Sequence, residues 1–177
     1  MKNFAFIDVF TQKLYGENFG SKAIFGVSEI RENLMNISAM VINDDLNFIS
    51  LKTNAKDYSE MDLECMMDTE IDLARQDYNF DSKQILLQKD MEDLRLYIDE
   101  VLKFIENHKI ETLFIYGLPF EKVINLGLEL LKPTLKVWIV VDCTKSLDGD
   151  EREKIKEYQK KGLKAISFRN LEKYLKI

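Results

Sequence analysis

The fold is decided by the stretch IYGLPFEKVINLG, residues 115–127. It joins the end of an apolar run to a turn at Gly117 and Pro119, and the turn to the start of a helical pattern. Glycine and proline favour turns, so the stretch predicts a buried strand that leads directly into a helix. Junctions of this kind often carry a nucleophile in α/β enzymes, yet the side chain one helical turn in is Val123.

Apolar runs of similar length lie on both sides of this stretch. Each run is short and continuous rather than alternating, which is typical of a strand buried on both faces of a parallel sheet. The predicted strands are residues 3–9, 47–51, 84–88, 112–117, 136–142 and 164–168.

Helical patterns separate these strands. One begins at Ser28, which we predict as its N-cap, and another over 91–108 has an apolar face. Residues 149–162 begin with acidic residues and end with lysines and a glycine, which predicts a surface helix. The apolar face of 91–108 comprises Leu94, Ile98, Val101, Leu102 and Ile105. The alternation predicts one α/β domain over residues 1–177, a three-layer α/β/α sandwich with a mainly parallel six-stranded sheet.

Composition excludes several classes of function. The chain has 25 basic and 31 acidic residues, a net charge of -6, and no basic stripe with aromatic residues, so we expect no nucleic-acid partner. The first apolar run is short and contains Asp8, which fits neither a signal peptide nor a membrane span. We therefore expect a cytoplasmic protein without membrane contact. The acidic stretch 57–81 is most simply a solvated surface.

Polar residues that follow the predicted strands are the candidates for a site. In open parallel sheets, ligands bind beyond the carboxyl ends of the strands. The residues there are Asp8, Lys89, the turn 117–123 and Asp142. On its own, Lys89 would be read as a surface lysine, and Asp142 is expected to close a turn.

In this order the motifs resemble those of the isochorismatase-like cysteine hydrolases, which include the nicotinamidases. FAFIDVF supplies Asp8, ILLQKDMEDL supplies Lys89, and LFIYGLPFEKVINLGLELL supplies the turn into a helix, while KVWIVVDCTKS resembles a late strand. The resemblance implies an isochorismatase-like, Rossmann-like topology and a homo-oligomer. It also implies catalytic roles for Asp8 as the base and Lys89 as the group that stabilises charge.

The centre of the resemblance departs from the family in two ways. The family's nucleophilic cysteine falls on Val123, which has no lone pair, and a shift to Lys122 or Ile124 still provides no thiol. The turn expected to bind substrate comprises Gly117, Leu118, Pro119 and Phe120. A cis peptide is expected at Leu118-Pro119, where proline has no N–H for an oxyanion hole. Losing one such donor costs about 2.7 to 4 kcal/mol of transition-state stabilisation.

No metal or cofactor site is expected. Nicotinamidases often carry histidine ligands after the second strand, whereas FISLKTNAKDYSEM, residues 48–61, contains none. The only histidine, His108, is interpreted as a helix-end residue. Cys65 and Cys143 stand in no cysteine or histidine cluster, and we interpret them as reduced thiols rather than displaced nucleophiles.

The sequence therefore favours an isochorismatase-like protein that has lost cysteine-hydrolase catalysis and binds a small molecule or serves in assembly, with Asp8 and Lys89 retained as an ion pair. One alternative is a divergent hydrolase of small amides or related C–N bonds, with an unidentified nucleophile or water activated by Asp8. Another is a partner-binding module in which the old pocket is filled.

Overall fold

The computed structural model describes residues 3–16, 20–64, 66, 82–149 and 151–175 of the chain. Its six strands form one sheet in the order β3-β2-β1-β4-β5-β6, and every neighbouring pair is parallel. The strands are β1 (Phe4–Val9), β2 (Asn47–Thr53), β3 (Gln84–Lys89), β4 (Thr112–Gly117), β5 (Lys136–Thr144) and β6 (Lys164–Ile166). The predicted α/β class and the parallel six-stranded sheet are confirmed.

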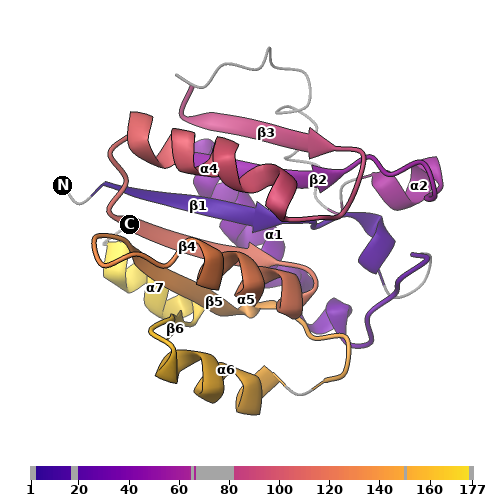
Figure 1. Ribbon diagram of the computed structural model, residues 1–177. Helices are drawn as coiled ribbons and strands as arrows, with labels where there is room; N and C mark the ends of the chain where they lie inside the picture. Colours follow the sequence, from indigo (N-terminus) through magenta and orange to yellow (C-terminus); the bar gives the residue numbers. More distant parts are fainter. Residues whose placement is uncertain (1–2, 17–19, 65, 67–81, 150, 176–177) are drawn as a thin grey trace.

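Helices cover both faces of this sheet (Figure 1). One face carries α1 (Val27–Asn43) and α7 (Phe168–Leu175), and the other carries α4 (Arg95–Asn107) and α5 (Phe120–Glu129). The remaining elements are the 3-10 helix η1 (Lys13–Tyr15), the short α2 (Glu60–Leu63) and α6 (Glu151–Lys160), which lies beside β6. None of the described residues forms a helix long and apolar enough to cross a membrane.

The two central strands are buried on both faces because their side chains are apolar at successive positions. All six residues of β4 are buried, and β1 is buried from Ala5 to Val9. On the α1 face, the rings of Phe6 and Phe114 stack with their centroids 5.2 Å apart. Burial of such rings is the main favourable contribution to folding.

The start of α1 and the end of β6 differ from the sequence-based predictions. The first helix begins at Val27 after Gly26, so the prediction of Ser28 as the N-cap is wrong. Val27 is buried, and a start at this residue places it on the same face as the other core residues of α1. The predicted strand 164–168 ends at Ile166, because Phe168 begins α7.

The predicted apolar face of 91–108 is confirmed only in part. Val101 and Ile105 are buried, but the deepest side chains of α4 also include Tyr97 and Phe104, which the pattern did not single out. The prediction of a surface helix over 149–162 is confirmed, since α6 has no buried residue.

Candidate functional site

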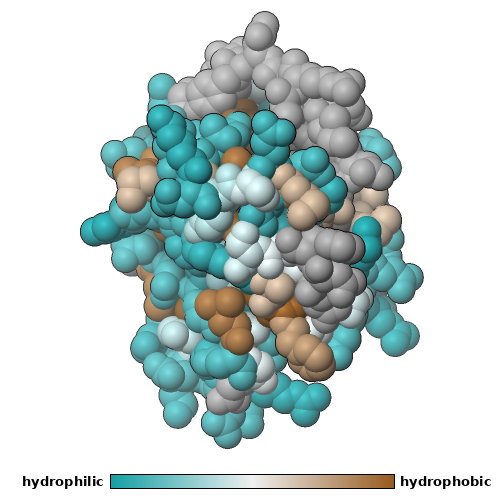
Figure 2. Space-filling view, turned by 90° about the vertical axis from the view of Figure 1, so that its right-hand side faces the viewer, coloured by the Kyte–Doolittle hydropathy of each residue, from teal (hydrophilic) through white to brown (hydrophobic). Residues whose placement is uncertain are grey.

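A cavity of about 740 Å³ opens at the end of the sheet where the parallel strands finish. Figure 2 views this end of the molecule and shows apolar residues surrounded by hydrophilic ones. Its walls come from the loop after β2, the loop 90–94 after β3, the start of α4, the exposed side of α5 and the loop after β5. The apolar lining consists of Ala55, Met91, Leu94, Ile98, Pro119, Leu128 and Leu147.

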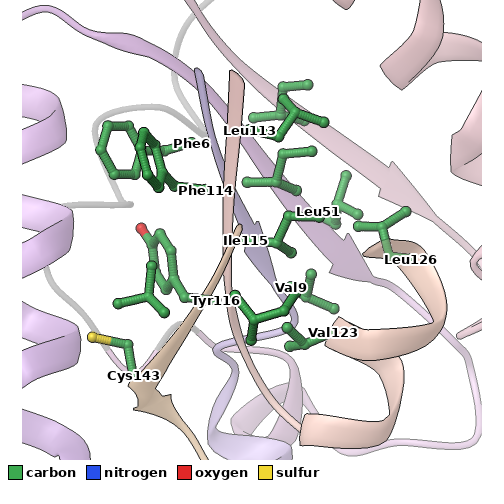
Figure 3. Close-up of a cluster of buried hydrophobic side chains, with 14 of the residues drawn as sticks. Phe6, Val9, Leu51, Leu113, Phe114, Ile115, Tyr116, Val123, Leu126 and Cys143 are labelled. Carbon is green, nitrogen blue, oxygen red and sulfur yellow. The ribbon is translucent and has the colours of Figure 1, made fainter. Parts of the chain in front are cut away.

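Val123, the position implied for the nucleophile, does not line the cavity. It is 0 % exposed, and Figure 3 shows its side chain beside Val9 in the core between α5 and the sheet. The neighbouring residue Lys122 does line the cavity. Successive residues on a helix point in directions about a quarter-turn apart, so Lys122 can face the opening while Val123 faces the sheet.

The turn 117–120 holds the start of α5 against β1. Gly117 has φ +117°, and a Cβ built there would lie 2.2 Å from the carbonyl oxygen of Val9. The N–H of Leu118 donates to the same oxygen at 2.7 Å, and the Leu118-Pro119 bond is cis, as expected. Leu118 and Phe120 are fully buried, so Pro119 is the residue of this turn that reaches the cavity.

Asp8 is fully buried in β1, where it lies in register with Ser50 of β2 and Tyr116 of β4. Its carboxylate accepts a hydrogen bond from the Thr11 hydroxyl. Asp8 is not among the residues that line the cavity.

Lys89 is the last residue of β3 and is directed toward α4. Its Nζ lies 2.5 Å from Oε2 of Glu100, and the side chains of both residues are about 30 % exposed. The contacts of the described residues thus contain no ion pair between Lys89 and Asp8, which was the pair suggested by the resemblance.

A different polar cluster lies at the inner wall of the cavity, around Glu92. Its carboxylate accepts a hydrogen bond from the Tyr15 hydroxyl at 2.8 Å and from Nζ of Lys22 at 2.6 Å. The ammonium of Lys22 also lies 5.1 Å from the ring centroid of Tyr58. The backbone carbonyl of Glu92 accepts a hydrogen bond from Nζ of Lys122. The cluster joins η1, the loop after β3 and α5.

The pKa values of the titrating groups in this cluster are shifted in different directions. Burial lowers the pKa of Lys122, and the charge of Lys22 adds to that effect, against the opposing influence of Glu92 and Asp93. Burial acts in the same sense on Lys22, but its contacts with Glu92 and Tyr58 outweigh it and raise the pKa. Burial and the Glu92 carboxylate both raise the pKa of Tyr15.

Carboxylates dominate the charged lining of the cavity. Among the described residues, two cations line it, Arg95 and Lys122, against the carboxylates of Asp57, Asp90, Glu92, Asp93, Glu121 and Glu129. Arg95 binds Asp93 through two side-chain nitrogens, and these hydrogen bonds lower the pKa of Asp93 to about 2. Glu121 accepts hydrogen bonds from the Ser146 hydroxyl at 2.6 Å and from Lys154 of α6 at 2.9 Å.

Cys143 provides no thiol in this cavity. Cys143 is fully buried, and Figure 3 shows it on the opposite side of the sheet from Val123. Burial raises the pKa of its thiol, as does the nearby Asp142. Asp142 itself accepts a hydrogen bond at 2.7 Å from the N–H of Phe168, and so fixes the start of α7 rather than closing a local turn. Cys65 lies outside the described residues.

The described residues offer no set of ligands suited to zinc. Across 3–16, 20–64, 66, 82–149 and 151–175, no three acidic, cysteine or histidine side chains group together in a way that could hold a metal ion. His108 caps the C-terminus of α4, with its ring 4.3 Å from that of Phe104. This is the helix-end position interpreted from the sequence.

Sequence reasoning missed the cluster around Glu92. Glu92 and Lys22 belong to no recognisable sequence motif. Lys122 was considered only as a neighbour of the implied nucleophile position. The one available signal was the position of Glu92, which follows a predicted strand as Lys89 does.

No protein-family model and no curated protein matches the sequence. Solved structures do match along nearly the full length. A nicotinamidase/pyrazinamidase of Bacillus subtilis is 12% identical, with a TM-score of 0.75 over 94% of this chain and 100% of that one. An isochorismatase family protein of Desulfovibrio vulgaris is 10% identical, with a TM-score of 0.74 over 100% of both chains.

A third match is the pyrazinamidase of Pyrococcus horikoshii, solved in complex with zinc. It is 14% identical, with a TM-score of 0.72 over 93% of this chain and 99% of that one. Together with the order of the strands in the sheet, these similarities show that the chain has the isochorismatase-like hydrolase fold.

Proposed function

We propose that this protein binds a small molecule in the cavity between the loop 90–94 and α5, without the cysteine chemistry of the hydrolases it resembles. One observation carries the proposal: at the start of α5, Val123 packs into the core while Lys122 lines the cavity. A buried valine provides no nucleophile, and Pro119 provides no N–H for an oxyanion.

The chemistry of the cavity agrees with a binding role. Its volume lies in the range of small-molecule sites, and it combines an apolar lining with a few charged groups. The excess of carboxylates favours ligands that are neutral or positively charged. We propose that the protein is also a homo-oligomer in the cytoplasm, as the resemblance implies.

Ligand-observed NMR with a panel of small amides and amines, including nicotinamide and pyrazinamide, tests the binding role. We expect saturable binding that is abolished by Asn125→Trp, because Asn125 is an exposed residue of α5 at the cavity. Thr134→Trp is the matched control, since Thr134 is also exposed but lies at a different cavity near the start of β5. Binding that survives Asn125→Trp, or no binding by any probe, contradicts the proposal.

Release of ammonia from the same amides tests the alternative of a divergent hydrolase. We expect no release above that of the Asp8→Asn variant, which removes the charge of the carboxylate but keeps its shape. Turnover by the natural sequence that Asp8→Asn abolishes, in a variant that remains folded by circular dichroism, would establish the hydrolase instead.

A further inference from the structure

Lys122 is held in an unusual setting for a lysine. Its side chain is partly buried against the Phe10 ring, with Nζ 5.8 Å from the ring centroid, and it lines the cavity. Within the described residues, its hydrogen-bond partner is a neutral backbone oxygen, that of Glu92. The Glu92 carboxylate is instead bound to Tyr15 and Lys22. Among the described residues, Lys122 therefore has no ion pair of the kind that normally stabilises an ammonium group.

The position of Lys122 on its helix acts in the same direction. It is the third residue of α5, where the partial positive charge of the helix terminus disfavours a cation. Burial also lowers the pKa of its amine. A larger share of Lys122 is thus neutral at physiological pH than of an exposed lysine, and a neutral lysine amine is a nucleophile toward carbonyl groups.

From this geometry we infer that Lys122 binds a small aldehyde or ketone covalently, as a Schiff base. The inference rests on the proposed binding role of the cavity and specifies the class of ligand. The Nζ lone pair forms a bond to the carbonyl carbon, and the carbonyl oxygen takes up a proton. Loss of water then breaks the C–O bond and leaves a protonated imine. No oxidant or reductant is needed.

The lining of the cavity selects among carbonyl compounds. The carboxylates of Asp57, Asp90 and Glu129 are exposed and line the cavity. The same carboxylates repel ligands that are themselves anions. A neutral compound with an apolar body, such as benzaldehyde, is therefore expected to react better than pyruvate.

Reductive trapping tests the inference on the full chain. The protein is incubated with benzaldehyde and sodium cyanoborohydride, and the modified lysines are identified by peptide mass spectrometry. We expect Lys122 to be modified several times faster than the exposed Lys136 and Lys160, and pyruvate to modify it more slowly than benzaldehyde does. Equal modification of the lysines, or an unmodified Lys122, overturns the inference.

A matched pair of variants separates this site from general lysine chemistry. Lys122→Arg keeps the positive charge but forms no imine, and is expected to lose the fast phase of labelling. The Lys136→Arg variant is expected to keep the fast phase of labelling. If Lys122 is not labelled while amides still bind in a manner sensitive to Asn125→Trp, the Schiff base is wrong and the binding role stands. If Lys122 is not labelled and no amide binds, the binding role is wrong as well.

Discussion

At the scale of single residues, Gly117 and Asp62 show how backbone and side chain place the site. Gly117 allows β4 to turn against β1 with a positive φ, directly before the helix that carries Lys122. Asp62 of α2 is buried and accepts hydrogen bonds from Ser21 and Ser59, which ties the segment after η1 to the loop after β2. Few other residue types could make the close contacts that these two residues make.

Gly117→Ala is expected to destabilise the protein by about 2 kcal/mol or more, since strain at a positive φ adds to overpacking against the backbone. The added Cβ would lie 2.2 Å from the carbonyl oxygen of Val9. Gly149→Ala is the control, because Gly149 also has a positive φ but its Cβ would meet nothing within 4 Å. Urea unfolding measures both variants. Equal losses would show that the contact with Val9 is unimportant.

Asp62→Asn is expected to lower the free energy of unfolding at neutral pH by about 1.5 to 3 kcal/mol, the range for hydrogen bonds to a charged group. Hydrogen bonds from Ser21 and Ser59 lower the pKa of Asp62 to about 2, from an ordinary value of 3.8. The ionised form therefore stabilises the fold above about pH 4, and this stability is lost as the pH falls toward 2.

Denaturant unfolding at neutral pH and near pH 3 tests this dependence. The difference between the natural sequence and Asp62→Asn should narrow at the lower pH. Asp99→Asn, on the exposed face of α4, is the control and should change little at either pH. A difference that is constant with pH would mean that the charge of Asp62 contributes nothing.

At the scale of elements, the rotation of α5 about its axis decides what the cavity contains. The helix buries Val123, Ile124 and Leu126 and turns Lys122 and Asn125 outward. The apolar residues of the helix fix this rotation, because they must face the sheet. The chemistry of the site follows from packing on the other side of the helix.

A pair of cysteine substitutions tests the rotation of α5. Lys122→Cys should react rapidly with a disulfide reagent, whereas Val123→Cys should react only when the protein unfolds, since buried thiols are inert. The natural sequence gives the background from its own two cysteines. If Val123→Cys reacts as fast as Lys122→Cys, the assignment of the inward and outward positions is wrong.

The sequence predicted the strands of the sheet but not the contacts that surround the cavity, for related physical reasons. Continuous apolar runs such as 112–117 identify buried strands, because a strand buried on both faces needs apolar side chains at successive positions. The contact between Lys122 and Glu92 instead joins residues 30 positions apart through the path of a loop. Likewise, a count from Gly117 identified position 123 but not the direction of its side chain. Lys89 was placed correctly after its strand, but its partner Glu100 depends on how α4 packs.

At the scale of the whole molecule, one sheet with helices on both faces connects all parts through the same core. Trp138 of β5 reports on this core, since its ring stacks 6.5 Å from that of Phe114 and lies 5.7 Å from that of Tyr174. It is the only tryptophan in the chain, so fluorescence follows this one region.

The protein is expected to unfold in urea as one cooperative unit. The change in Trp138 fluorescence should coincide with the loss of far-ultraviolet circular dichroism, which follows all helices and strands. The single domain predicted from the sequence requires this coincidence. Two separate transitions would show that β5 and its neighbours unfold independently of the rest.

The attachment of α6 has a practical consequence. Lys154 connects this helix to Glu121 on the cavity wall and to Asp148 in the preceding loop, while the opposite face of the helix, which includes Arg152 and Lys156, is exposed to solvent. A fluorophore introduced on that outer face would disturb no core contact. Because Lys154 binds Glu121 on the cavity wall, such a dye offers an optical reporter of cavity occupancy in which the bound molecule itself carries no label.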